Sequence, residues 1–348
     1  MKRPTMQDIA RRAGVTKAAV SFALNGRPGV SDLTRRRILA IAEELGWRPS
    51  SAARALSGGR AGSFGMVIGR PARTLGLEPF FMQLLSGIQA ELTRDTTPLL
   101  LTMVEDQAAE IALYRDWWAR RLVDGVFVVD LQVDDARVPV LQELGMPAVI
   151  IGAPCGTGGP PAVGHDEAAG VEVAVRHLAE LGHRRVARVS GPAHLRHIRI
   201  REEAFARVTA QWGLTGRSVE ADYSGERGAA ATRELLSAAD PAARPTAILY
   251  DNDVMALSGL TAAHGLGLRV PADLSLVAWD DSALCELVSP SLTALSRDVV
   301  AHGAHAARRL RQAAGGGPHG GLEEPPAPSL TLRGSTGPAP ADGSGKPV

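Results

Sequence analysis

Polar residues with the chemistry to hold a small ligand stand shortly after apolar runs of the sequence. Asn252 and Asp280 each follow such a run closely, and Arg199 comes after a Ser-Gly-Pro turn at 190–192. The guanidinium of Arg199 offers a planar fork of donors to vicinal hydroxyls or to a carboxylate. The Asn252 amide donates and accepts hydrogen bonds, and the Asp280 carboxylate accepts them. An arginine, an asparagine and an aspartate in one cleft suit a polyol such as a sugar, and a nucleobase is the alternative ligand.

The same sequence gives little support for catalysis. A sugar-processing hydrolase that uses Asp280 and Asp253 is the enzyme alternative, but glycosidase action needs two carboxylates at a set separation, which a sequence cannot show. No Gly-rich phosphate loop, metal-spaced cluster or nucleophile elbow is present. Cys155 and Cys285 are far apart and lack the spacing of a zinc site. We therefore expect no enzyme activity, no cofactor and no metal.

The elements that must position these residues alternate between short apolar runs and longer helical stretches such as 167–181 and 252–264. The predicted strands are 64–68, 98–104, 125–129 and 148–151, followed by a second set at 186–190, 247–250 and 274–279. Strands that alternate with helices predict parallel sheets covered on both faces. Two such doubly wound lobes place a ligand cleft at the carboxyl ends of their strands. The Gly/Pro-rich segment 155–161 is the expected crossover between the lobes.

Charge is divided unevenly along the 348 residues. Residues 1–60 hold twelve Lys/Arg and four Asp/Glu, which gives this head +8 and leaves −7 on the other 288 residues. A compact basic head on an acidic body indicates a polyanion as the partner of the head alone. The alternative is a solvated basic face without a partner.

The head has the spacing of a helix-turn-helix. Helices are predicted over 6–13, 17–24 and 32–45, with hydroxyl residues Thr5, Thr16 and Ser31 in position to cap them, Asp32 being the alternative third cap. The motif needs a small residue where two helices touch, a glycine in the turn and a branched apolar residue that locks the second helix, and Ala10, Gly14 and Val20 supply these. Leu24 and Ile38 can close the small core. A three-helix module without DNA function is the alternative.

At this point the sequence resembles the LacI/GalR family of bacterial repressors. The resemblance is carried by residues 5–25, 28–31, 34–38, 44–49 and 52–56, and it runs through nearly the whole chain to 332–336. It implies an all-α helix-turn-helix head over 1–47, a hinge over 48–60 and a periplasmic-binding-protein-like body of two doubly wound parallel-sheet lobes over 61–336. Residues 337–348, rich in Gly, Pro and Ala, are predicted to be a disordered tail.

The resemblance also implies how the head reads DNA. The second helix would lie in the major groove, with the base-reading positions at Lys17, Ala18 and Phe22. Lys17 would donate to guanine and Phe22 would pack on thymine methyls, although family members often carry a polar or basic residue at the Phe22 position and core packing is the alternative. Positions that hold phosphates, and so carry no sequence code, are Thr16, Ser21, Asn25, Ser31 and Thr34.

In the resembling family the segment 48–58 folds into a short hinge helix on cognate DNA. Ala53 is small enough for two such helices to approach closely, and Leu56 would wedge into the minor groove at the operator centre. The alternative is a flexible linker with a chance leucine.

For the body, the resemblance assigns ligand contacts to residues near strand ends. They are Phe80, Phe81, Arg199, Asn252, Trp279 and Asp280. Core packing is the alternative for the three aromatic residues, and a surface salt bridge is the alternative for Arg199. Asp281 is expected to be structural.

The resemblance further implies a homodimer on palindromic operator DNA, whose affinity a small effector changes by re-angling the lobes. The N-terminus has no apolar segment of a secretory signal, and no stretch approaches 18 uninterrupted apolar residues. We therefore expect a cytoplasmic protein without membrane contact. A periplasmic-type solute-binding protein is the rival, but it would carry a signal peptide and no basic helix-turn-helix.

Overall fold

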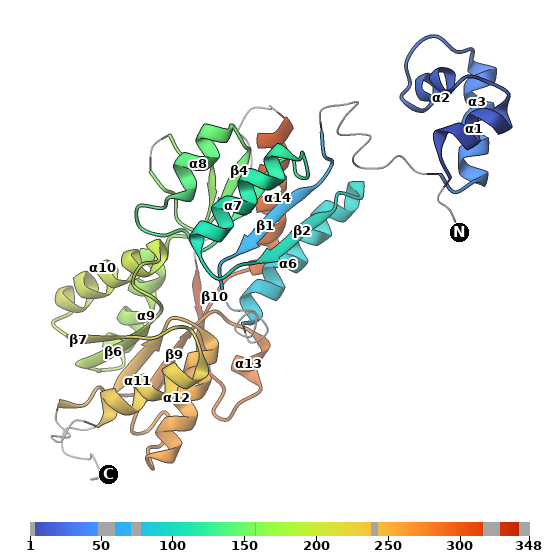
Figure 1. The fold of residues 1–348 in the computed structure, drawn as a ribbon. Coiled ribbons are helices and arrows are strands. Elements are labelled where there is room, and N and C mark those ends of the chain that lie inside the picture. Colours follow the sequence, from blue (N-terminus) through green and yellow to red (C-terminus); the bar gives the residue numbers. More distant parts are fainter. Residues whose placement is uncertain are drawn as a thin grey trace. The chain divides into compact units, whose positions relative to one another are not determined.

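The computed structural model describes residues 4–47, 60–70, 78–156, 158–237, 243–315 and 328–340. The chain forms two compact units, Met1–Ala61 and Gly62–Val348, which we call the head and the body (Figure 1). Within the described residues, none of the helices has the length and apolar character needed to cross a membrane.

Three short helices form the head: α1 (Met6–Ala13), α2 (Lys17–Leu24) and α3 (Asp32–Glu44). Each helix begins at a side-chain hydroxyl that accepts a hydrogen bond from a first-turn N–H, provided by Thr5, Thr16 and Ser31. Gly14 ends α1 with a φ of 65°, the left-handed conformation that lets the chain turn sharply into α2. Ala10, Val20 and Ile38 are buried together in the core. The three predicted helices and their packing are therefore confirmed.

The first lobe of the body is built on a parallel sheet with the strand order β2-β1-β3-β4-β5. Its strands are β1 (Phe64–Ile68), β2 (Leu99–Met103), β3 (Val126–Val128), β4 (Ala148–Ile151) and β5 (Ala162–Val163). One face packs against α6 (Pro79–Leu92), which continues into the 3₁₀ turn η1 (Thr93–Asp95), and α14 (Val299–Gly315). The other face packs against α7 (Gln107–Ala119) and α8 (Arg137–Leu144).

The second lobe has the strand order β11-β10-β9-β8-β6-β7, parallel except for β11. Its strands are β6 (Arg185–Ser190), β7 (Thr215–Glu220), β8 (Ala247–Tyr250), β9 (Ser275–Trp279), β10 (Thr293–Ser296) and β11 (Ser329–Thr331). Helices α9 (Glu167–Glu180) and α10 (Arg196–Gln211) cover one face, and α11 (Gly225–Leu236) and α12 (Asp253–Gly265) cover the other, while the short α13 (Ala283–Glu286) follows β9. The body thus has the two doubly wound lobes expected from the alternating pattern.

The chain passes between the lobes three times: after β5, between β10 and α14, and between α14 and β11. As a result α14, which is made late in the sequence, completes the core of the first lobe (Figure 1). Gly87 on α6 and Gly303 on α14 mark the crossing of these helices. A Cβ atom at Gly87 would lie 1.9 Å from the backbone oxygen of Val300, so only glycine permits this approach.

Two expectations about the borders of the body are corrected. The segment 155–161 is not the crossover, because β5 follows it and still pairs with β4 in the first lobe. The prediction of disorder is wrong for residues 337–340, because Gly337 N donates to Ser275 Oγ at 3.1 Å and Ala339 N donates to the Leu181 carbonyl at 2.8 Å. A high content of Gly and Pro suggests disorder, but it does not predict the individual hydrogen bonds that hold a segment in place.

Candidate functional site

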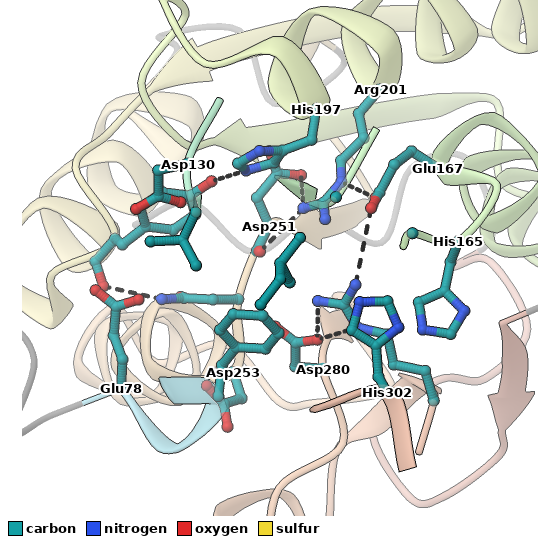
Figure 2. Close-up of a pocket in the computed structure, with 18 of the residues that line it drawn as sticks. Glu78, Asp130, His165, Glu167, His197, Arg201, Asp251, Asp253, Asp280 and His302 are labelled. Atoms are coloured by element: carbon teal, nitrogen blue, oxygen red, sulfur yellow. Dashed lines mark hydrogen bonds and ion pairs between the residues drawn. The ribbon is translucent and has the colours of Figure 1, made fainter. Parts of the chain in front are cut away.

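A cavity lies between the two lobes of the body, at the carboxyl ends of strands from both sheets (Figure 2). It encloses about 730 Å³, its open mouth included. Among the described residues, its charged lining consists of the arginines Arg70, Arg201 and Arg297 and the acids Glu78, Asp130, Glu167, Asp251, Asp253 and Asp280. The position at the strand ends is the one that the doubly wound topology predicts.

Arg70 holds two carboxylates of the first lobe. Its Nη1 donates to the two Glu78 oxygens at 2.6 and 2.7 Å, and its Nε and Nη2 donate to the two Asp130 oxygens at 2.7 and 3.0 Å. Burial raises the pKa of Glu78 to about 7, although the charge of Arg70 opposes the rise. The guanidinium carbon also lies 4.7 Å from the centre of the Tyr223 ring in the second lobe. Arg70 therefore links the lobes by a cation–π contact while it neutralises the acids beside it.

Arg201 on α10 is buried in the wall of the second lobe. Its Nε donates to Glu167 Oε2 at 2.7 Å, and its Nη1 donates to the Asp251 carbonyl at 3.3 Å. The Asp251 carboxylate is itself bound by the buried Arg188. Because a guanidinium carries five N–H donors, these two hydrogen bonds leave donors of Arg201 for a ligand in the cavity.

Arg297 stands in the segment that passes from β10 to α14. Its Nη2 lies 2.7 Å from Asp280 Oδ1, and its Nη1 lies 3.7 Å from Glu167 Oε1. The guanidinium carbon is 5.0 Å from the centre of the Phe80 ring. Asp280 has a φ of 67°, a left-handed backbone conformation that few side chains adopt and that is concentrated at functional sites. A carboxylate of the second lobe and an aromatic ring of the first are thus held on one arginine.

Imidazole rings complete the polar lining. His197 Nε2 lies 2.7 Å from the Tyr223 hydroxyl, and His302 stacks on His165 with ring centres 4.7 Å apart. Burial lowers the pKa of His197, and the neighbouring charge of Arg201 lowers it further. Burial also lowers the pKa of His302 to about 3. His197 and His302 are therefore neutral at pH 7.

Phe80, Asn252 and Asp280, three of the residues predicted to contact a ligand, line this cavity. Asn252 also forms two hydrogen bonds with backbone groups. Its Oδ1 accepts from Met255 N at 2.8 Å, which caps α12, and its Nδ2 donates to the Tyr223 carbonyl at 3.0 Å. The Asn252 amide, which was predicted to bind a ligand, therefore makes most of its hydrogen bonds within the protein.

Phe81 and Trp279 lie behind the cavity wall. Phe81 packs in the core of the first lobe, and Trp279 is buried in the second lobe under the guanidinium of Arg201. Neither ring lines the cavity, so the core alternative describes both. Asp281 is structural as expected, since Arg333 Nη1 donates to its Oδ1 at 2.7 Å.

Arg199 is wrong as a ligand contact. Its side chain is 56 % exposed and lies 3.8 Å from Glu203, which is the surface pair given as the alternative. Arg201 takes the place in the cavity that was assigned to Arg199. Residues advance by about 100° each around a helix, so two positions along α10 reverse the direction of the side chain.

The sequence reasoning missed Arg70, Asp130 and Arg297 as well as Arg201. A usable signal was present for two of them, since Arg70 and Asp130 come within two residues of the ends of the predicted strands 64–68 and 125–129. Arg297 follows β10, which was not predicted from the sequence. The residues directly after β1 and β3 were not among those predicted to contact a ligand, although sites gather at strand ends. Glu78 and His302 had no comparable signal, because the packing of α6 and α14 carries them to the cavity, and His165 follows β5, a strand that was not predicted.

The head presents α2 as a second candidate site. Lys17, Ala18 and Phe22 are all exposed on this helix, and Phe22, 38 % exposed, rests near Gly29 and stays outside the head core. The five residues predicted to hold phosphates are exposed or half-buried around α2 and the start of α3: Thr16, Ser21, Asn25, Ser31 and Thr34. The hinge residues Ala53 and Leu56 lie outside the described residues.

Comparison with family models assigns both units. Residues 5–50 match the model described as bacterial regulatory proteins, lacI family, and residues 175–336 match the model of a periplasmic binding protein-like domain. The HTH-type transcriptional regulator MalR of Streptomyces coelicolor is 35% identical over 351 residues, which cover 97% of this chain and 98% of MalR. CelR of Thermobifida fusca is 31% identical, over 89% of this chain and 91% of CelR.

Solved structures agree with these matches. The lac repressor dimer bound to operator and the anti-inducer ONPF superposes with a TM-score of 0.82 at 27% identity, covering 97% of this chain and 100% of the repressor chain. A complex of the regulator CelR with cellobiose superposes with a TM-score of 0.69 at 28% identity, covering 96% of this chain and 100% of that one.

Proposed function

The chain belongs to the lacI family of bacterial regulatory proteins, and we propose that it acts as a dimeric repressor whose affinity for operator DNA is controlled by a sugar in the cavity of the body. The observation that carries this proposal is the presence in one chain of an exposed helix-turn-helix face and an interlobe cavity lined by charged groups. A DNA reader alone needs no ligand cavity, and a solute-binding protein alone needs no helix-turn-helix.

A sugar fits the chemistry of the cavity. Each sugar hydroxyl both donates and accepts, and this lining offers guanidinium donors on Arg201 beside carboxylate acceptors such as Asp280. Phe80 adds an apolar ring surface, on which a pyranose face can pack. The similarity to CelR in its cellobiose complex supports the same ligand class. The ligand is bound and released unchanged, in keeping with a family of regulators rather than enzymes.

On the DNA side, we assign base reading to Lys17, Ala18 and Phe22, and phosphate contacts to the hydroxyl and amide side chains around them. The exposure of all three reading positions supports this assignment. Ala53 and Leu56 would form the minor-groove hinge, as in the family that the chain belongs to. Because a half-site on each side of a palindrome needs its own head, the acting form is a homodimer. Its place of action is the cytoplasm, where the operator is.

Control would follow from the linkage of the two sites. The cavity is walled by both lobes, so a ligand that prefers one lobe angle shifts the population of that arrangement. Arg70 and Arg297 each contact an aromatic ring of the opposite lobe, which makes these contacts sensitive to that angle. A change in lobe angle alters the spacing of the two heads, and operator affinity changes with it.

Two measurements on the full chain test this proposal. A thermal-shift screen with sugars and nucleobases is expected to find stabilisation by a sugar, and fluorescence anisotropy with a selected palindromic duplex is expected to show salt-sensitive binding that the same sugar changes. Absence of binding to any palindrome selected from random DNA would contradict the DNA half. Stabilisation by nucleobases in place of sugars would contradict the assigned ligand.

A further inference from the structure

Two of the buried side-chain atoms on the cavity wall without a hydrogen-bond partner among the described residues bear on the ligand. They are Oδ2 of Asp253 and Nδ1 of His302, and each side chain belongs to a residue that is only 3 % exposed. Figure 2 shows both side chains among the lining residues. A buried polar atom without a partner costs free energy, so a ligand that brought hydrogen-bond donors to these atoms would be favoured.

Asp253 differs from the other acids of the lining. Glu78, Asp130, Glu167, Asp251 and Asp280 each form an ion pair with an arginine. The Oδ1 of Asp253 accepts from the adjacent Val254 N at 2.8 Å and the Ser282 hydroxyl is a hydrogen-bond partner of the carboxyl group, but no ion pair between described residues includes Asp253. Burial raises the pKa of Asp253 to about 6, with Asp280 adding to the rise and the nearby Ser282 hydroxyl offsetting part of it. At neutral pH it is a charged acceptor without a cation.

His302 offers a second acceptor. Burial lowers its pKa to about 3, so the ring is neutral, and the backbone of Val163 provides a hydrogen-bond partner for the imidazole. A backbone carbonyl can only accept, so the nitrogen that faces it carries the proton. Nδ1, the nitrogen without a partner, is therefore the acceptor. Both incompletely bonded atoms call for donors from the ligand.

The balance of charge in the lining has the same consequence. Among the described residues, the lining holds six carboxyl groups against three arginines, and the buried Arg188 behind Asp251 raises the arginines only to four. Even with Glu78, whose pKa is about 7, counted as half protonated, the carboxylates outnumber the arginines. The excess is negative, and in a buried site it favours a ligand that brings positive charge. A phosphate or carboxylate group on the ligand would add to the excess.

We propose that the effector is an amino sugar, bound with its protonated amine against Asp253 and with a hydroxyl that donates to His302. This inference rests on the proposed function, because it names the ligand class of the same cavity. Neutral sugars satisfy the hydrogen bonds without neutralising Asp253, and sugar phosphates oppose the charge of the lining. The expected order of affinity is amino sugar, then neutral sugar, then phosphorylated sugar.

The test is calorimetric titration of the full chain with matched sugars. The probes are glucosamine, N-acetylglucosamine, glucose and glucose 6-phosphate, together with galactosamine against galactose and the chitosan disaccharide against cellobiose. In at least one pair the amine is expected to bind about tenfold more tightly than its neutral parent, because a charge-assisted hydrogen bond replaces a neutral one. The N-acetyl form, which keeps the nitrogen but loses its charge, is expected to lose that advantage.

Two variants assign the effect to its residue. Asp253→Asn keeps the shape of the side chain and removes its charge, and it is expected to bring the amine and its neutral parent to similar affinity. Glu172→Gln makes the same charge change on an exposed part of α9 and is expected to leave the preference intact. Thermal melts of both variants establish that they fold.

The outcomes separate this inference from the function on which it rests. Equal or weaker binding of the amine in every pair overturns the amino-sugar assignment, while binding of neutral sugars leaves the proposed function standing. A preference that survives Asp253→Asn also overturns it. Absence of binding by any sugar overturns the inference together with the ligand half of the proposed function, and operator binding is then judged separately.

Discussion

The guanidinium carbon of Arg201 lies 3.7 Å from the centre of the Trp279 ring, and Glu167 Oε2 lies 2.7 Å from its Nε. The ring covers one face of the guanidinium, Glu167 binds its Nε and the Asp251 carbonyl accepts from its Nη1, so the donors that remain for a ligand are those left over by these contacts. Burying a charged group in this way is stable only because its partners are fixed beforehand. The arrangement explains why the tryptophan is needed here although it does not line the cavity.

Replacing Arg201 by alanine is expected to destabilise the body by about 3 kcal/mol, because it leaves the buried Glu167 with only the longer ion pair to Arg297 at 3.7 Å. Arg201→Lys, which keeps the charge but not the planar fork, should lower sugar affinity with a smaller loss of stability. Urea denaturation and thermal-shift titration measure the two effects. Arg199→Ala, on the exposed side of the same helix, is the matched control. A similar loss in both alanine variants would contradict the placement of Arg201 in the cavity.

Phe22→Ala is expected to weaken operator binding by about tenfold or more, since an apolar contact with thymine methyls contributes to base discrimination. The head should stay folded, because Phe22 is exposed and lies outside its core. Anisotropy titration with the selected operator and its base variants gives the change in affinity and specificity. Leu39→Ala removes an exposed apolar residue from α3 and serves as the control. Unchanged discrimination in Phe22→Ala would reject the base-reading role.

Leu56→Ala is expected to keep the fold and lose most operator affinity, because a leucine wedge compensates the cost of kinking DNA. A gel-shift titration measures the loss. Its comparison is Ser57→Ala, the same replacement one residue further along the hinge. Equal affinity of Leu56→Ala and the parent chain would identify this segment as a plain linker.

The body is expected to lose stability in acid through His183. This buried ring lies 2.9 Å from Thr246 Oγ1 and 3.0 Å from Ser275 Oγ, and burial lowers its pKa from the ordinary 6.5 to about 4. His183 binds a proton less readily in the folded state than in the unfolded chain. Its contribution to the free energy of unfolding is therefore complete above pH 6.5 and is lost toward pH 4, by roughly 3 kcal/mol in total.

Urea denaturation between pH 4.5 and 7.5 tests this contribution. His183→Gln has no proton to bind, so its stability should depend less steeply on pH below 6.5 than that of the parent chain. If the stability of the two proteins depended on pH in the same way, His183 would not be the source of the pH dependence.

Gly87→Ala is expected to destabilise the first lobe by more than 2 kcal/mol, since its Cβ would meet the Val300 backbone and force α6 and α14 apart. Gly265, the last residue of α12, has no atom within 4 Å of an added Cβ and no left-handed φ. Gly265→Ala should therefore be neutral or stabilise by about 0.5–1 kcal/mol. Thermal melts compare the pair, and an unchanged melting temperature in Gly87→Ala would show that the helix crossing adapts.

Much of the fold followed from local pattern. The head was predictable because hydroxyl caps, a turn glycine and a helical apolar period agree over a short segment, and Thr5, Gly14 and Ile38 do what their positions indicate. The strands of the body were predictable because buried parallel strands read as continuous apolar runs, as in Phe64–Ile68.

The site was less predictable, because its lining is assembled from distant elements. Asp280 was found from its place after a strand, but direction around a helix decides between Arg199 and Arg201, and the sequence does not fix which face points to the cavity. Glu78 and His302 reach the cavity only through the packing of α6 and α14 on the first sheet. Such contacts depend on tertiary structure, which periodicity does not encode.

The threefold passage of the chain between the lobes sets an order for biogenesis. On the ribosome the first lobe is made early but waits for α14 until the strands of the second lobe up to β10 have emerged. Until then the apolar surface that α14 covers, including Val149 and Ile151 of β4, stays open to chaperones and proteases. A nascent chain that stops before residue 299 lacks α14 and cannot close this surface, so the first lobe reaches its finished core only after most of the second lobe has been made.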